Sequence, residues 1–497
     1  MEPVIDLPAE LTAFLDRPAP QSLVIRGAPG TGKSLLALAL LEAFPGPRMY
    51  VSSRVPRSRL KLDIPSFGRL AEAGQLSIVD MTARGTDLRT ATRSLEAVGE
   101  LVVSDDSTAG LRALLLPPEV LEAWSQVSPS TPTMIVLDSW DAIAERHVDI
   151  TGTVGESLPS REELDRVALN QMVEGPVFLV MVLEHPEAGQ LEYLVDGVVV
   201  VEREIHEDRM ERWLRIEKLR GTRIARSSYP FSLEGGRFHT IVPLKMDQRP
   251  EPPPIDPQPS PSPGQIWPGS ADYASFFGRL SVGKITLIEL DQEVPNSAVA
   301  MMVAPLLNQV VAGGGRIVHI PPPGMQPTEI WQLYQGRTSK DAFLRQVRLL
   351  CPLPDGGSED LTPAILPLPS SNMGGYTPRV PEAARFLSES SDPAKPNLAI
   401  LSIAGMDAIN GLVPGAYTPN SLPGLTLTFL HQSPLHGVFI GYAGEPLTRA
   451  IRPMVDTHIR LTARDGRVFV HGIIPRTPSL ALSEGDDRAP YHLVLVV

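Results

Sequence analysis

Cysteine is almost absent from this sequence, because Cys351 is the single one among 497 residues. A lone cysteine excludes an intramolecular disulfide framework and is typical of proteins from a reducing cytoplasm. We therefore predict a cytoplasmic protein in which Cys351 is a small buried apolar residue rather than a reactive thiol. The N-terminal residues MEPVIDLPAELTAF carry acids early and lack a basic region before an apolar core, so no secretion signal is expected.

Positive charge and long apolar runs are also scarce. The chain has 44 Lys and Arg against 57 Asp and Glu, which gives a net charge of −13. This surplus argues against broad attraction to nucleic acid or anionic lipid, although a local basic groove stays open. No apolar run reaches the length of a membrane span, so no membrane partner is expected. At this length the chain has room for two or three domains, each with a sizeable core.

Proline, by contrast, is abundant and concentrated in one stretch, RPEPPPIDPQPSPSPGQIWPG, which begins at Arg249. Such a composition cannot form helix or sheet and is typical of an extended spacer. We therefore predict a linker over residues 249–268 between a domain of residues 1–248 and a domain of residues 269–497.

The first domain alternates strand-like and helix-like segments. The strand candidates are apolar throughout rather than alternating, as in strands buried on both faces of a parallel sheet. They lie at residues 22–27, 48–53, 75–81, 133–139 and 175–185. After them, GVVVVERE and RMERWLRIEKLRG flank the charged turn IHED and predict an antiparallel hairpin. The pattern predicts an α/β fold with a mainly parallel β-sheet flanked by helices.

The second domain reads as a degenerate copy of the first. KITLIELDQEVPNSAVAMM has the strand, loop and helix layout of QSLVIRGAPGTGKSLLALA. GRIVHIPPPG stands in the place of RMYVSSRVP, NLAILSIAGMDAI parallels TMIVLDSWDAI, and RPMVDTHIRLTARDGRVFV parallels LEYLVDGVVVVEREIHED, all in the same order. Four matching blocks predict a tandem duplication. The alternative is that any two α/β domains share this rhythm.

A phosphate-binding loop is the most specific motif in the chain. GAPGTGKS matches G-x-x-x-x-G-K-[ST] and lies between an apolar strand and an amphipathic helix, in a chain with only seven lysines. Its main-chain N–H groups would face phosphate oxygens, Lys33 would reach the β- and γ-phosphates, and the Ser34 hydroxyl would ligate Mg²⁺. The predicted ATP-binding residues are Gly27, Ala28, Pro29, Gly30, Thr31, Gly32, Lys33 and Ser34.

Two carboxylates follow later strands. Asp138 ends the strand TMIVLDS, where it would meet the magnesium ion or its water shell. Without a phosphate loop nearby, a helix-capping role would be the preferred interpretation of this aspartate. Glu184 ends the next strand. It could sense nucleotide, bond across a subunit boundary, or be a solvated charge.

Residues 20–245 resemble a KaiC-family domain of the RecA/RadA superfamily. The resemblance is carried by the phosphate loop, Asp138, YLVDGVVVVERE and EKLRGTRIARSSYPFSLEGGRF. The resemblance implies two RecA-like P-loop domains and a homo-oligomer, a hexameric ring with ATP at the subunit interfaces. It also implies that Lys218 and Arg220 reach the phosphate site of the neighbouring subunit. A cation there would stabilise developing charge. A solvent-exposed cationic strand is the alternative.

The residues expected to activate water are missing. Aligned on Pro56, the paired catalytic glutamates of the family fall at Ser53 and Arg54. Serine is a weak acceptor and protonated arginine cannot accept a hydrogen bond, so we predict tight ATP binding with slow or absent hydrolysis, as in a pseudo-ATPase. Arg54 could clamp the γ-phosphate, or could belong to a solvated basic loop.

The second domain lacks a phosphate loop. LDQEVPNS, residues 290–297, replaces it, with Pro295 and Asn296 where glycine and lysine belong, and Ala404 opposite Asp138. No ATP is expected there. The domain is predicted to stack as a second tier or to present a surface for a protein partner.

The leading interpretation is a KaiC-like protein whose ring assembly or regulatory scaffold depends on ATP·Mg²⁺. The first alternative is an active slow ATPase, a timer or motor of the KaiC/RadA type. The second is a RecA-like DNA-binding protein that uses residues 147–163 or 54–62, although the former stretch is net acidic. A clock core would need a second intact phosphate loop, and family members without clocks act as regulators.

Overall fold

The computed structural model divides the chain into two compact units, residues 1–241 with 496–497 and residues 242–495. The predicted linker lies largely outside the described residues, but Gln265 and Ile266 already form strand β10 of the second unit. The structure describes residues 7–18, 20–82, 131–151, 160–173, 176–185, 189–241, 243–244, 262, 264–335, 337–351, 359–367, 379–389, 395, 397–406, 435–485 and 489–496.

The first unit is built on one sheet, whose described strands number nine. Pairing is parallel from β3 to β6 and antiparallel from β6 onward, so the predicted α/β class with a mainly parallel sheet is confirmed. In spatial order the strands are β3 (Ser77–Asp80), β2 (Arg48–Ser52), β4 (Thr133–Asp138), β5 (Val177–Val182), β1 (Gln21–Arg26), β6 (Gly197–His206), β7 (Arg209–Leu219), β8 (Ser228–Ser232) and β9 (His239–Thr240).

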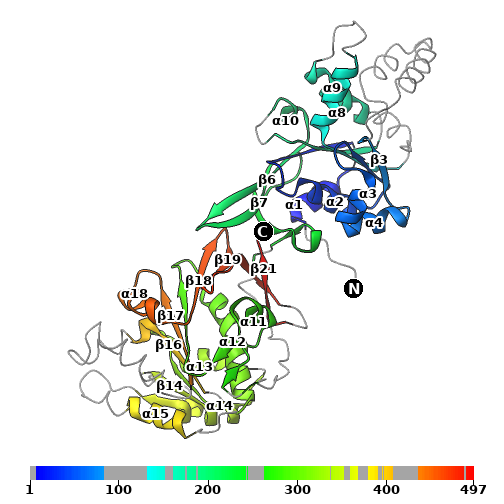
Figure 1. Ribbon diagram of the computed structural model, residues 1–497. Helices are drawn as coiled ribbons and strands as arrows, with labels where there is room; N and C mark the ends of the chain where they lie inside the picture. The colour runs from blue at the N-terminus through cyan, green and yellow to red at the C-terminus, as the bar shows by residue number, and fades with distance from the viewer. Residues whose placement is uncertain are drawn as a thin grey trace. The chain divides into compact units, whose positions relative to one another are not determined.

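Helices cover both faces of this sheet (Figure 1). The strands β1 and β5 are buried along their whole length, because each face packs against a helical layer. One layer contains α1 (Ala9–Leu15), α2 (Lys33–Ala43), α3 (Arg57–Asp63) and α4 (Pro65–Glu72), and the other α8 (Trp140–Thr151), α9 (Arg161–Val173) and the short α10 (Leu191–Leu194).

The predicted hairpin is formed by β6 and β7. Its two-residue turn consists of Glu207 and Asp208, which have φ of 48° and 57°. Positive φ at both turn positions matches the right-handed twist of the strands, and aspartate tolerates this conformation better than most residues. A 3₁₀ turn at Glu234–Gly236 follows β8.

The second unit has a larger sheet, with ten described strands. Its pairing is parallel from β15 to β18 and antiparallel beyond. The strands in spatial order are β15 (Ile365–Pro367), β14 (Val347–Cys351), β13 (Ile317–Ile320), β16 (Asn397–Ser402), β17 (Leu435–Tyr442), β12 (Ile285–Leu290), β18 (Thr457–Arg464), β19 (Arg467–Ile474), β20 (Ser479–Glu484) and β21 (Tyr491–Leu495).

The helices of the second unit also lie on two faces (Figure 1). α11 (Ala271–Phe277), α12 (Asn296–Ala312), α13 (Pro327–Gln332) and α14 (Lys340–Gln346) share one core, and α15 (Arg379–Ser388) and α18 (Pro446–Ile451) the other. Two 3₁₀ turns, at Glu359–Ala364 and Arg452–Met454, and the small β10 (Gln265–Ile266) and β11 (Leu280–Ser281) pair complete the unit. Cys351 is buried in the first of these cores, as predicted.

The two sheets share one strand order. Without the extra edge strand β15, the second sheet runs β14-β13-β16-β17-β12-β18-β19-β20-β21, and the first runs β3-β2-β4-β5-β1-β6-β7-β8-β9. Each strand therefore has a counterpart that occupies the same place in the chain and in the sheet. This agreement supports the duplication that the sequence blocks predict.

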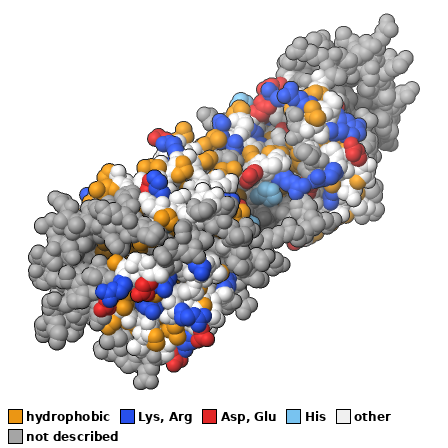
Figure 2. Space-filling view, turned by 60° about the horizontal axis from the view of Figure 1, so that its bottom comes forward, with side chains coloured by type: hydrophobic (Ala, Val, Ile, Leu, Met, Phe, Trp, Pro, Cys, Tyr) orange, Lys and Arg blue, Asp and Glu red, His pale blue; other side chains and the backbone are white. Residues whose placement is uncertain are grey.

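None of the described helices is long and apolar enough to cross a membrane. On the face drawn in Figure 2, lysine and arginine side chains are spread over the described surface in small groups, with acidic side chains beside them.

Candidate functional site

The phosphate loop joins β1 to α2 at the carboxyl edge of the first sheet (Figure 1). Gly27 and Gly32 have φ of 154° and 106°, which L-residues with a side chain rarely adopt. A Cβ on Gly27 would lie 2.1 Å from the Val201 carbonyl oxygen, and one on Gly32 would lie 2.8 Å from Leu233 Cδ1. Glycine is therefore required at both positions by backbone conformation and by space.

The side chain of Lys33 binds main-chain carbonyls of its own phosphate loop. Its Nζ donates to the carbonyl oxygens of Gly27 at 2.7 Å and Ala28 at 2.9 Å, and the side chain is buried. Burial lowers the pKa of Lys33, while the charges of Asp138, Glu184 and Asp141 act in the opposite direction. The ammonium is thus held where phosphate oxygens could replace the two carbonyls as stronger, charged acceptors.

Ser34 and Asp138 meet beside the loop, as the sequence predicts. Ser34 Oγ donates to Asp138 Oδ2 at 2.6 Å, and the Tyr50 hydroxyl donates to the same oxygen. Burial raises the pKa of Asp138, which the hydrogen bonds from Ser34 and Tyr50 and the charge of Lys33 offset only in part. A buried carboxylate next to a hydroxyl is an oxygen donor set suited to Mg²⁺. These two residues would hold the ion, which would supply positive charge between the β- and γ-phosphates.

Ser53 and Arg54, which occupy the place of the expected glutamates, are both engaged elsewhere. Ser53 is buried, accepts a hydrogen bond from Ser139 N at 2.8 Å and donates to the Asp138 carbonyl oxygen at 3.2 Å. Its hydroxyl fixes the end of β4. Arg54 Nε lies 2.5 Å from Glu184 Oε1. No water-orienting acceptor comes from the described end of β2.

Glu184 is a carboxylate of this site whose role the sequence left open. Ser139 Oγ donates to Glu184 Oε1 at 2.9 Å, and Glu184 N donates to Asp141 Oδ2 at 2.6 Å. Asp141 is itself held by an ion pair with Arg161 at 2.9 Å. Glu184 follows β5, which is the neighbour of β1 in the sheet, so its carboxylate lies beside the phosphate loop.

Arg212 is a residue of the site that the sequence does not indicate. It belongs to β7, and its Nη1 donates to the Gly30 carbonyl oxygen in the phosphate loop at 2.8 Å. Burial lowers the pKa of Arg212, and the nearby charge of Arg203 adds to that effect. Nothing in the local sequence signals this contact, because the two residues are 182 positions apart.

Lys218 and Arg220 do not contact the phosphate loop of their own chain in any described interaction. Lys218 Nζ donates to the carbonyl oxygens of Glu192 at 2.9 Å and Val195 at 2.6 Å, and Arg220 Nη2 donates to that of Tyr193 at 3.0 Å. Both cations thus bind carbonyls at the end of α10. Arg220 N donates to Asp196 O, level with the start of β1, about 17 Å along that strand from the loop. A role toward a neighbouring subunit stays a prediction.

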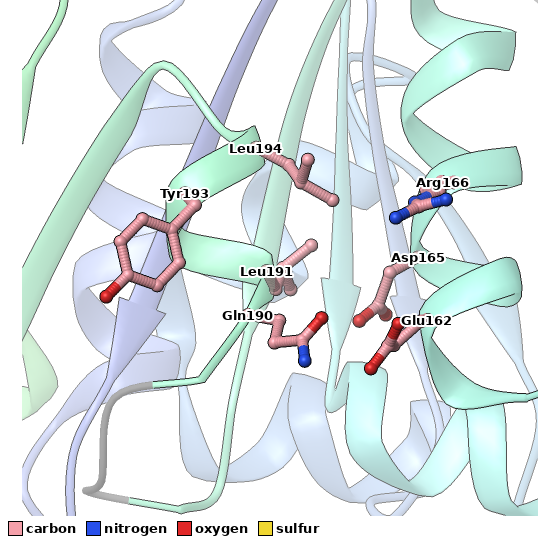
Figure 3. Close-up of a pocket in the computed structure, with 7 residues that line it drawn as sticks. All are labelled: Glu162, Asp165, Arg166, Gln190, Leu191, Tyr193 and Leu194. Atoms are coloured by element: carbon pink, nitrogen blue, oxygen red, sulfur yellow. The ribbon is translucent and has the colours of Figure 1, made fainter.

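A pocket of about 320 Å³ lies between α9 and α10 (Figure 3). Tyr193 points away from the side chains of α9 and is 81% exposed. The pocket is lined by Glu162, Asp165, Arg166, Gln190, Leu191, Tyr193 and Leu194.

The second unit can be aligned with the first residue by residue, because an aspartate makes the same hydrogen bond to the start of the equivalent strand in each unit. Asp196 accepts from Ser22 N at 3.0 Å, and Asp456 accepts from Ile285 N at 2.9 Å. Ser22 and Ile285 are therefore equivalent, and the chain that follows Ile285 places Asn296 at the position of Lys33. α12 begins at Asn296 as α2 begins at Lys33. The predicted replacement of the phosphate loop by residues 290–297 agrees with this register.

One predicted equivalence was wrong. The pairing of β4 and β1 with β5, and of β16 and β12 with β17, places Ser402 rather than Ala404 opposite Asp138. The sequence alignment relied on two Asp-Ala-Ile triplets, which lie two positions out of the strand register. Neither residue carries a carboxylate, so the predicted lack of a metal ligand is unchanged. Asp291 of the replaced loop pairs with Arg460 at 3.0 Å.

Comparison with known proteins finds similarity over both units. Residues 11–219 match the family model described as "GvpD gas vesicle protein, P-loop domain". The chain is 26% identical to Protein GvpD2 of Halobacterium salinarum, over 97% of this chain and 94% of that protein. It is 29% identical to Protein GvpD1 of the same organism, over 49% of this chain and 42% of that protein. These matches support a P-loop family, and they do not single out a KaiC-like one.

Proposed function

We propose that this protein binds ATP and Mg²⁺ in its first unit, assembles into a homo-oligomeric ring when ATP is bound, and acts as a regulatory scaffold with slow hydrolysis. The observation that carries the proposal is the closed loop of Lys33 beside the Ser34–Asp138 pair, in a site where Ser53 and Arg54 supply no acceptor for water. Such a site grips a triphosphate better than it cleaves one.

A ring is supported by the position of Lys218 and Arg220. Both lie away from the phosphate loop of their own chain and bind carbonyls at the end of α10, so a phosphate group that replaced those carbonyls would have to come from another copy. A cation donated across an interface would couple nucleotide occupancy to assembly. By resemblance to KaiC-like proteins we propose a hexamer, with the second unit as a stacked tier or a surface for a protein partner.

The relatives suggest the process. The matching family model is described as a gas vesicle protein, and one GvpD relative is similar over nearly the whole chain. We therefore place the proposed scaffold in gas vesicle regulation. A DNA-binding role is less well supported, because the candidate stretch 147–163 is net acidic and Arg54 in the other stretch is paired with Glu184. Residues 152–159 of the first stretch lie outside the described residues.

The test is particle mass at equilibrium, measured without nucleotide, with ADP·Mg²⁺ and with ATP·Mg²⁺. We expect a shift from small species to a particle of six chains with ATP alone. The Lys33→Ala variant should remain small under all three conditions, and Asn296→Ala, its counterpart in the second unit, should behave like the unsubstituted protein. A mass that is the same with and without ATP would exclude nucleotide-dependent assembly.

A second candidate function is a slow ATPase of the KaiC/RadA type. The observation in its favour is Glu184, a carboxylate that stands beside the phosphate loop. Turnover at about one per second or faster that is lost in Lys33→Ala would favour this candidate over a scaffold.

A further inference from the structure

The ion pair between Arg54 and Glu184 crosses the site from one strand end to another. Arg54 follows β2, Glu184 follows β5, and the sheet places β4 between these two strands. The side chains meet beyond the end of β4, where Ser139 Oγ also donates to Glu184. The pair therefore lies along the same carboxyl edge as the phosphate loop.

The carboxylate of Glu184 is fixed independently of Arg54. Ser139 Oγ donates to Oε1, the same carboxylate oxygen that Arg54 contacts, and Asp141 accepts from the main-chain N–H of Glu184 at 2.6 Å. The charge of Glu184 acts on both Lys33 and Asp138, which places it within electrostatic reach of the phosphate and metal positions. Removing Arg54 would leave this carboxylate in place, with one acceptor site open.

Arg54 is the more exposed partner of the pair. Its side chain is 56% exposed, against 27% for Glu184, and an exposed ion pair contributes little because water competes for both charges. A γ-phosphate offers a guanidinium several charged oxygens in a geometry that suits bidentate hydrogen bonds. A triphosphate in the loop would thus compete with Glu184 for Arg54, and a diphosphate, which lacks the γ-phosphate, would compete less.

We infer that the Arg54–Glu184 pair is a γ-phosphate-responsive latch: bound ATP draws Arg54 onto the γ-phosphate, and the released Glu184 carboxylate orients the water that attacks it. This inference rests on the proposed nucleotide site. It explains how slow hydrolysis occurs without an acid after β2, and it makes the site distinguish ATP from ADP.

The step balances with water as the only co-reactant. The water oxygen forms a bond to the γ-phosphorus, and the bond from that phosphorus to the β–γ bridging oxygen breaks. ADP leaves with the electron pair of the broken bond, and inorganic phosphate forms. The Glu184 carboxylate accepts the proton that the water loses and passes it to solvent.

The test combines nucleotide affinity with single-turnover hydrolysis. The dissociation constants of ATP and ADP are measured by displacement of a fluorescent nucleotide from the full chain and from the variants Arg54→Ala, Glu184→Gln and their double. Arg57→Ala, which removes another exposed arginine at the start of α3, is the matched control and should change neither constant.

The latch predicts opposite shifts in the two single variants. Glu184→Gln removes the competitor for Arg54, so ATP should bind several-fold more tightly, ADP should be unchanged, and hydrolysis should fall about a hundredfold. Arg54→Ala should weaken ATP about tenfold and leave ADP unchanged. In the double variant the gain in ATP affinity from Glu184→Gln should vanish, because Arg54 is no longer there to be released.

Each outcome decides the matter. If ATP and ADP affinities change together in both single variants, or if neither changes, the latch is wrong while the proposed ATP site stands. If hydrolysis persists in Glu184→Gln, another group orients the water and the inference fails. If the unsubstituted chain binds neither nucleotide, both the latch and the proposed function are overturned. Thermal unfolding of each variant shows that it is folded, and Arg54→Ala alters only an exposed side chain.

Discussion

The two units have the same strand order and different chemistry at the carboxyl edge of the sheet. The first unit has Lys33, Asp138 and Glu184 there. By strand register the second has Asn296, Ser402 and Tyr442 at these positions, and Pro323 in place of Arg54. The described strands of the second sheet are nevertheless well packed. The residues that hold the fold together are thus separate from those at the proposed nucleotide site.

A buried charge survives in both units, with its sign reversed. Arg26 of β1 pairs with Glu192 at 2.8 Å and Glu217 at 2.7 Å. The equivalent residue of β12 is Glu289, which accepts from Arg452 and lies 3.0 Å from His458. The carboxylate at this position in the second unit would repel phosphate, since it stands on the strand that leads to the former loop.

The largest expected difference between the two units is in how much their stability falls at acidic pH. Burial lowers the pKa of His319 and of His436 in the second unit to about 4, from an ordinary value of 6.5. The unfolded chain then binds more protons than the folded one below pH 6.5, so stability is lost as the pH falls toward 4. Each histidine should cost about 2.5 kcal/mol between pH 7.5 and pH 4.5. Calorimetry should show the transition of the second unit moving down first.

The matched control for the acid experiment is His206, which is exposed in the first unit. His319→Phe should flatten the pH dependence of the second transition, and His206→Phe should leave both transitions unchanged. Equal sensitivity of the two transitions to acid would show that these histidines are not the cause. ATP identifies the transition of the first unit, because a ligand that binds the folded state stabilises it.

Breaking one buried ion pair should affect one unit only. Arg452→Ala removes the nearest guanidinium of the nearly inaccessible Glu289 carboxylate, and Glu192→Ala removes one of the two partners of Arg26. Glu192→Ala should lower the free energy of unfolding of the first unit by roughly 3 kcal/mol, and Arg452→Ala should lower that of the second unit by less, because Arg452 is 40% exposed and His458 and Arg460 remain beside Glu289. Arg215→Ala breaks an exposed pair with Glu202 and should cost less than about 1 kcal/mol. Loss of both transitions together would mean that the units do not unfold separately.

Substitutions at equivalent positions of the phosphate loop and of the segment that replaces it in the second unit should differ in their effect on nucleotide affinity. Lys33→Ala removes the buried ammonium and should weaken ATP binding about a hundredfold, or roughly 2.7 kcal/mol. Asn296→Ala should leave the affinity within error of the unsubstituted value. Isothermal titration of both variants with ATP·Mg²⁺ makes the comparison, and a comparable loss in Asn296→Ala would place nucleotide in the second unit.

The smallest effect is expected at the ends of β4 and β16. Asp138→Asn keeps the shape of the residue that holds Ser34 but removes its charge. The factor by which Mg²⁺ increases ATP affinity should therefore fall about tenfold. Ser402→Ala, at the equivalent place, should have no effect. The measurement is ATP affinity as a function of Mg²⁺ concentration. An unchanged Mg²⁺ dependence in Asp138→Asn would remove this residue from the metal site.

The sequence predicts motifs and elements formed by neighbouring residues, and it does not predict contacts between residues that the order of the strands brings together. The phosphate loop and the parallel strands follow from glycine spacing and from continuous apolar runs, and Asp138 follows from its place at a strand end. The pairing of Arg54 with Glu184 depends on the order β2-β4-β5, which no local pattern contains. For the same reason the sequence predicts Ala404 opposite Asp138, because two Asp-Ala-Ile triplets match, whereas the hydrogen-bond register of the strands places Ser402 there.

The most direct test of the account is the location of bound nucleotide. The full chain is saturated with azido-ATP and Mg²⁺, illuminated, and the labelled peptides are identified by mass spectrometry. We predict at most one label per chain, in peptides of the first unit, which is lost in Lys33→Ala and retained in Asn296→Ala. Label in residues 280–300, or label that survives Lys33→Ala, would contradict the division of the chain into one unit that binds ATP and one that does not.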